Sequence, residues 1–96
     1  MATTKDYKDF IVSQLSILDG ITYKPMMGEY ILYYDGVIFG GIYDDRLLIK
    51  KTEGNKKYNM EDAIPYEKGK PMYYVEDVDN QDLLRDIVLD TYEDLK

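Results

Sequence analysis

Residues 30–50 read YILYYDGVIFGGIYDDRLLIK, and this stretch decides the fold. Runs rich in Ile, Leu, Val, Tyr and Phe are interrupted by two short polar pairs, Asp35-Gly36 and Asp44-Asp45. Such pairs between β-rich runs are typical of two-residue hairpin turns. The stretch therefore predicts three consecutive antiparallel strands, at about 29–35, 37–43 and 46–51.

The flanking residues extend this sheet and add two helices. A further strand is expected at 21–27, and Met72 to Val75 predicts the last one, after a long connection at 52–70. Apolar residues at three- and four-residue spacing predict a helix over 4–19, with Thr3 and Asp6 as a variant of the capping box. A closing helix is expected to begin with Asp79 as its N-cap. These elements predict an α+β fold: an N-terminal helix, an antiparallel sheet of about five strands and a C-terminal helix, with both helices on one sheet face.

The two predicted turns also predict which residues share a face. A two-residue turn at Asp35-Gly36 places Leu32 opposite Phe39 and Tyr30 opposite Gly41. The helix-covered face is then expected to hold Ile31, Tyr33, Ile38, Ile42, Leu47 and Ile49. The opposite face is aromatic with cationic edges, and its candidate interaction residues are Tyr30, Tyr34, Phe39, Tyr43, Arg46 and Lys50.

A solvent-exposed sheet face with this much apolar area is expected to be covered, and the sequence allows three kinds of cover. In the first, the 52–70 connection folds back over this face and covers it with Tyr58, Met60, Ile64 and Tyr66. In the second, a second copy of the chain covers it in a homodimer. In the third, a ligand binds there. Basic residues just before this connection and within it are the kind that single-stranded nucleic-acid platforms use beside an aromatic face, so the ligand could also be a nucleic acid. These basic residues are Lys50, Lys51, Lys56, Lys57, Lys68 and Lys70.

The predicted C-terminal helix carries an acidic strip. Asp82, Asp86, Asp90 and Asp94 recur at every fourth residue, so their carboxylates share one helix face and repel one another. The strip is either a solvated face or a surface for a basic protein partner.

The composition excludes several classes of protein. The chain has 96 residues, which make one domain over 1–96, and it contains no Cys and no His. The usual zinc sites, disulfides and imidazole-dependent active sites are therefore excluded, and we expect no metal, no cofactor and no enzymatic activity. With 19 acidic against 12 basic residues, the chain repels polyphosphate in general. A charged N-terminus and the lack of a long apolar run lead us to expect a cytoplasmic protein with no membrane partner.

Three segments resemble the N-terminal domain of the TfoX/Sxy family of bacterial competence regulators. They are YKPMMG at 23–28, YYDGVIFGGI at 33–42 and DRLLIK at 45–50, followed by the strand MYYV at 72–75. Met27 stands where the family usually has Phe, and Glu29 where a second Gly is common. The resemblance implies an α+β fold and a link to transcription regulation through protein partners. We therefore expect a non-enzymatic regulatory or protein-interaction module. The alternative is a small nucleic-acid or ligand-binding domain that uses the aromatic face and the lysines.

Overall fold

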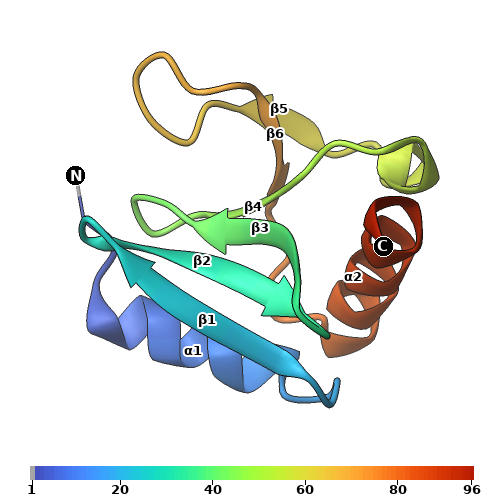
Figure 1. Cartoon of the computed structure of the whole chain (residues 1–96), viewed down its shortest axis with the longest axis horizontal. Helices are drawn as coiled ribbons and strands as arrows, with labels where there is room; N and C mark the ends of the chain where they lie inside the picture. The colour runs from blue at the N-terminus through green and yellow to red at the C-terminus, as the bar shows by residue number, and fades with distance from the viewer. Residues whose placement is uncertain (1) are drawn as a thin grey trace.

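The computed structural model describes residues 2–96 and places two helices around one antiparallel sheet (Figure 1). Its sheet has six strands in the order β1-β2-β3-β4-β6-β5. The elements are α1 (Lys5–Leu15), β1 (Ile21–Met26), β2 (Glu29–Tyr34), β3 (Val37–Ile42), β4 (Leu47–Ile49), the short 3₁₀ helix η1 (Glu53–Tyr58), β5 (Glu61–Ala63), β6 (Met72–Val75) and α2 (Gln81–Leu95). The predicted α+β fold is confirmed, with six strands in place of about five.

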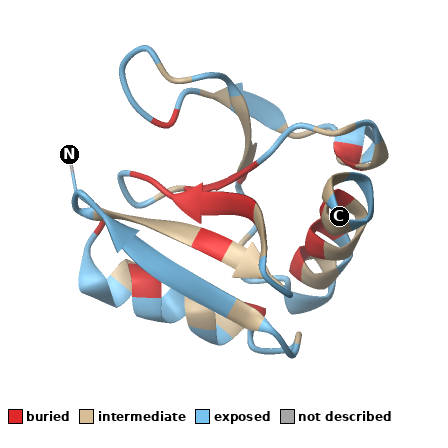
Figure 2. Cartoon of the chain, in the orientation of Figure 1, coloured by how far each residue is buried: buried red, intermediate tan, exposed pale blue. Residues whose placement is uncertain are grey.

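Both helices pack on one face of the sheet, as expected from the sequence. Ile11 and Leu15 of α1 and Leu84, Ile87 and Val88 of α2 join the buried side chains of the sheet in one hydrophobic cluster. Figure 2 shows that burial is concentrated in β3 and β4 and on the inner sides of the helices, whereas β1 at the sheet edge is largely exposed. Burial of apolar surface in this layer is the main stabilising contribution. No helix in residues 2–96 is long and apolar enough to cross a membrane.

A β-bulge changes the predicted register between β2 and β3. The turn at Asp35-Gly36 pairs Tyr34 with Val37 and Tyr33 with Ile38, as predicted. The register then shifts by one residue, so that Leu32 lies opposite Gly40 and Tyr30 opposite Ile42. The predicted pairs of Leu32 with Phe39 and of Tyr30 with Gly41 are therefore wrong. Phe39 is the extra residue, which local alternation does not reveal.

Because of the bulge, the helix-covered face and the open face are exchanged relative to the prediction in β2 and the first half of β3. Phe39 is fully buried in the helix-covered core, and Tyr30 and Tyr34 pack against that core. The prediction that these three lie on the open face is wrong. Ile31, Tyr33 and Ile38, predicted to face the helices, lie outside the core cluster. Beyond the bulge, Ile42, Leu47 and Ile49 face the core as predicted, because the turn at Asp44-Asp45 has the expected register.

The helix ends differ from their predicted positions. Thr4, rather than Thr3, caps α1 by accepting a hydrogen bond from the Tyr7 amide at 3.2 Å. The Thr3 hydroxyl instead donates to the Glu29 carboxylate at 2.7 Å, which ties the N-terminus to the sheet. Helix α1 ends at Leu15, four residues early, and Asn80 caps α2 in place of Asp79.

The predicted 52–70 connection contains structure of its own. Its first part forms η1 beside α2, and residues 61–63 form β5 at the sheet edge. Its last part, residues 64–71, passes over the sheet face that the helices leave open, where Tyr66 lies beside Tyr43. The connection is therefore divided between two sides of the molecule.

Candidate functional site

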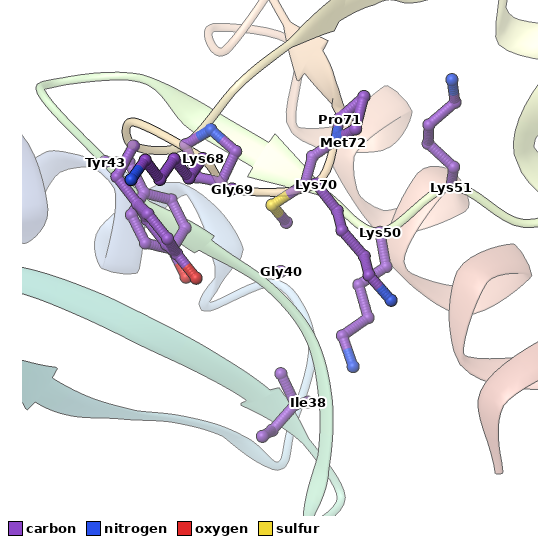
Figure 3. Close-up of a pocket in the computed structure, with 12 residues that line it drawn as sticks. Ile38, Gly40, Tyr43, Lys50, Lys51, Lys68, Gly69, Lys70, Pro71 and Met72 are labelled. Carbon is purple, nitrogen blue, oxygen red and sulfur yellow. The ribbon is translucent and has the colours of Figure 1, made fainter.

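The sheet face opposite the helices carries a cleft of about 570 Å³, which we call the basic cleft. Its walls come from β3, the end of β4 and the 64–71 segment. Figure 3 shows Lys50, which follows β4, and Lys70, which precedes β6, pointing into the same space, while Lys51 points away and Lys68 lies beside Tyr43. The lining residues are Ile38, Gly40, Tyr43, Lys50, Lys51, Pro65, Tyr66, Lys68, Gly69, Lys70, Pro71 and Met72.

Close packing positions Tyr43 in the wall of the basic cleft. Its ring lies over Gly41, where a Cβ atom would come within 2.6 Å of the ring and 2.7 Å of the Tyr30 carbonyl oxygen. Only glycine fits there, so the ring is 7% exposed and meets Tyr66 with 6.1 Å between ring centroids. Burial, followed by the neighbouring Tyr66 and Glu29, raises the pKa of the Tyr43 hydroxyl. Tyr43 is therefore a neutral, rigid wall of the cleft at physiological pH.

Arg46 holds the loop that forms the opposite wall. Its guanidinium donates to the Tyr43 carbonyl at 3.1 Å and to the Ile64 carbonyl at 3.1 Å. Both bonds bind backbone oxygens, so Arg46 links the β3–β4 hairpin to the start of the 64–71 segment. Its role in this structure is to position the loop.

The lysines of the connection fall into two groups. Lys51 pairs with Asp62 at 2.9 Å, Lys56 with Glu53 at 2.8 Å and Lys57 with Asp90 at 3.0 Å. None of the ion pairs in residues 2–96 includes Lys50, Lys68 or Lys70. Lys50, Lys68 and Lys70 therefore bring unpaired positive charge to the basic cleft, where the paired Lys51 also lies.

The predicted aromatic interaction face is thus only partly formed. Tyr43 and Lys50 lie together at the basic cleft, with Arg46 beside them. Tyr30, Tyr34 and Phe39 belong to the opposite side, in or against the core. Tyr66 of the connection, expected as a cover, takes part in the cleft wall and is 57% exposed.

The predicted acidic strip is divided as well. Asp82 and Asp86 lie in the first half of α2 and are paired there with Arg85, at 3.4 and 3.2 Å. Asp90 accepts a hydrogen bond from the Tyr58 hydroxyl at 2.5 Å, and Asp94 accepts one from the Gly54 amide at 2.6 Å. The second half of the strip therefore anchors η1 and is not free for a partner.

Titration reflects this anchoring. The hydrogen bond from Tyr58, followed by that from Lys57, lowers the pKa of Asp90. Burial and the nearby carboxylates of Asp90 and Asp86 raise the pKa of Tyr58 above its ordinary value. The Tyr58 hydroxyl stays a hydrogen-bond donor to a charged Asp90 over the whole physiological range.

A second hollow, which we call the acidic pocket, lies between η1, the end of β6 and α2. It has a volume of about 260 Å³. Val75 and Ile87, both 2% exposed, form its apolar base with Met60 and Leu83 beside them. Its rim carries three exposed carboxylates that take part in no ion pair of residues 2–96, those of Glu61, Glu76 and Asp77.

Sequence reasoning missed both the residue that anchors η1 and the carboxylates at the rim of this second hollow. Asn55 is fully buried and donates to the Lys50 carbonyl and to the Thr91 hydroxyl, both at 2.8 Å. Its own side-chain oxygen accepts from the Thr52 amide at 3.0 Å. The available signal was the pattern Thr52-x-x-Asn55, which has the spacing of a helix start. Glu61 lies in β5, and the adjacent pair Glu76 and Asp77 follows β6, so no local pattern in the sequence links the three.

Two comparisons with known proteins agree with each other. The family described as the TfoX N-terminal domain matches residues 13–94. A curated relative from Spirochaeta aurantia, described as an uncharacterized 12.7 kDa protein in the trpE 5′ region, is 35% identical over 92 residues. That alignment covers 88% of this chain and 80% of the relative.

Proposed function

The chain belongs to the TfoX N-terminal domain family, and we propose that it is a non-enzymatic regulatory module that acts by binding a protein partner. The link to transcription regulation comes from the resemblance of its motifs to the competence regulators. The absence of His and Cys supports binding over catalysis, since imidazole, the commonest general acid and base, and the strongly nucleophilic thiol are missing. A cytoplasmic location is part of the same proposal.

The acidic pocket carries this proposal. A pocket of about 260 Å³ is smaller than the roughly 300–1,000 Å³ of sites that enclose whole small molecules. It is suited to one or two side chains of a partner. Its apolar base with three unpaired carboxylates at the rim favours the stem and charged head of an Arg or Lys residue.

The first half of the acidic strip, which is not bonded to η1, extends this surface. Leu83 and Ile87 of α2 line the acidic pocket, and Asp82 and Asp86 lie on the same half of that helix. The carboxylate of Asp86 is close enough to Tyr58, another lining residue, to raise its pKa. We therefore expect the partner segment to be basic, with at least one apolar side chain. Complementary charge of this kind raises association rates and orients the partner.

Photo-crosslinking tests the proposal. A photoreactive amino acid at Met60 is used to capture a partner in an extract of the source cells, and the crosslinked segment is identified by mass spectrometry. We expect a basic segment, and at least about tenfold less crosslinked product when Glu76→Lys and Asp77→Lys are combined, because unlike charges are replaced by like charges.

The matched control combines Asp6→Lys and Asp19→Lys, which change the net charge equally at exposed positions of the α1 region. It should retain most of the crosslinked product. Equal loss in both variants would show general charge attraction, and a crosslinked segment without basic residues would contradict the proposal.

A further inference from the structure

We propose that the basic cleft binds a small organic anion with at least two negative charges and a flat ring, the chemistry of a nucleotide. This site is separate from the acidic pocket and takes a ligand of opposite charge. Its volume, about 570 Å³, lies well within the range of sites that enclose small molecules.

The charge of the basic cleft is the first support for this ligand class. Lys50 and Lys70 converge on one space from the end of β4 and from the residue before Pro71 (Figure 3). Two ammonium groups repel each other at close range, and no carboxylate of residues 2–96 pairs with either of them. The surrounding protein has a net charge of −7, so these free cations stand out in an acidic molecule. An anion with two charges would pair with both ammonium groups.

The apolar part of the lining is the second support. Pro65, Pro71, Met72 and Ile38 provide apolar walls, and Tyr66 is 57% exposed beside the rigid Tyr43 ring. A flat ring stacks favourably on an exposed tyrosine, and such contacts are tolerant of the ring's identity. Lysine contacts alone would favour a free phosphate, whereas these walls favour an organic body.

The size and charge of the surroundings favour a small ligand over a nucleic-acid strand. A strand extends far beyond a cleft of this volume and would meet the acidic remainder of the protein. Lys56 and Lys57, which a longer anion would need, are already paired with Glu53 and Asp90.

Calorimetry on the full chain at low ionic strength, with ADP, pyrophosphate, adenosine and a twelve-residue oligothymidine as probes, tests the proposal. We expect saturable binding of ADP, about tenfold or more weaker binding of pyrophosphate and of adenosine, and no tighter binding of the oligonucleotide. Lys50→Gln with Lys70→Gln should weaken ADP binding at least about tenfold. Tyr66→Ala should weaken ADP and leave pyrophosphate unchanged.

The matched control is Lys24→Gln with Lys56→Gln, two exposed lysines outside the cleft that change the net charge equally. It should retain ADP affinity within about twofold. All the altered side chains are exposed, and equal melting temperatures of the variants would show that folding is unchanged. No saturable ADP binding, equal loss in the control, or pyrophosphate binding as tight as ADP would overturn the proposal. Tight binding of the oligonucleotide, with no binding of ADP, would show that the cleft is a nucleic-acid interface and not a small-molecule site. The acidic pocket is untouched by these variants, so protein binding is tested independently.

Discussion

The two halves of the long connection between β4 and β6 behave as different kinds of structure. Residues 52–60 are bonded to α2 through side chains, with Asn55 fully buried and Tyr58 and Gly54 bound to Asp90 and Asp94. Residues 64–71 overhang the basic cleft, and among residues 2–96 one side-chain hydrogen bond holds them, from Arg46 to the Ile64 carbonyl. Ile64 and Tyr66 are each more than half exposed.

The difference shows that one half of the connection stabilises the fold, whereas the other half borders a candidate binding site. The first half uses carboxylates of α2 as anchors, so half of the acidic strip serves the fold. The rim of the acidic pocket is formed by other carboxylates, those of Glu61, Glu76 and Asp77. The second half leaves its lysines unpaired and its tyrosine exposed, so the cleft stays accessible. Binding surfaces commonly lie on such weakly held segments, supported by a rigid scaffold.

Removing the anchor of the first half should have the largest effect. Asn55→Ala deletes a buried side chain that makes three hydrogen bonds, and leaves the Lys50 carbonyl and Thr52 amide without their partner. We expect the free energy of unfolding to fall by about 2 to 3 kcal/mol, measured by urea denaturation. Lys56→Ala, at an exposed position of the same segment, serves as the control and should change it by less than about 0.5 kcal/mol. If both variants lowered the free energy of unfolding by the same small amount, the Asn55 hydrogen bonds would not anchor residues 52–60.

A smaller effect, with a characteristic pH dependence, is expected for Tyr58→Phe. The variant loses one hydrogen bond to a charged group that is partly exposed, so we expect a loss of about 1 kcal/mol near neutral pH. The lowered pKa of Asp90 means that its contribution is present above the ordinary value of 3.8 and is lost as pH falls through the pKa in the folded state. The raised pKa of Tyr58 means that its contribution is present below 10.0 and is lost as pH rises further.

Unfolding experiments from pH 2 to 11 compare the two proteins. The stability difference between wild type and Tyr58→Phe should narrow at both ends of this range. A difference that stayed constant with pH would mean that the bond between Tyr58 and Asp90 does not stabilise the fold.

The smallest effect is expected in the second half of the connection. Glu67→Ala changes an exposed side chain that has no ion pair within residues 2–96, and the free energy of unfolding should change by less than about 0.5 kcal/mol. Hydrogen exchange should show amides of 66–70 exchanging faster than those of 54–58 in the wild type, because fewer contacts oppose local opening. Equal protection of both segments would remove the contrast between them.

Much of the fold could be predicted because its signals are local. Turn pairs at Asp35-Gly36 and Asp44-Asp45 set the hairpins, and helical spacing located α1 and α2. The bulge at Phe39 could not be predicted, since one inserted residue exchanges the faces of everything on its far side without changing the composition of the strand. Tyr30, Tyr34 and Phe39 were therefore placed on the wrong face.

The candidate sites were predictable only in part, for a similar reason. The sequence shows that the lysines near the connection and the aspartates of α2 are charged. It does not show which of them form ion pairs. Lys57 and Asp90 lie 33 positions apart and neutralise each other, whereas Lys50 and Lys70 lie 20 apart and remain free. Such pairings depend on how distant segments pack.

The sequence by itself determined the elements, the hairpin turns, the family resemblance and the lack of imidazole and thiol chemistry, because each depends on residue type or short-range spacing. The tertiary structure decided which side of the sheet each tyrosine faces. It also decided which charged side chains form ion pairs or anchor η1, and which remain unpaired. Those outcomes depend on a single register shift and on contacts between residues far apart in the chain.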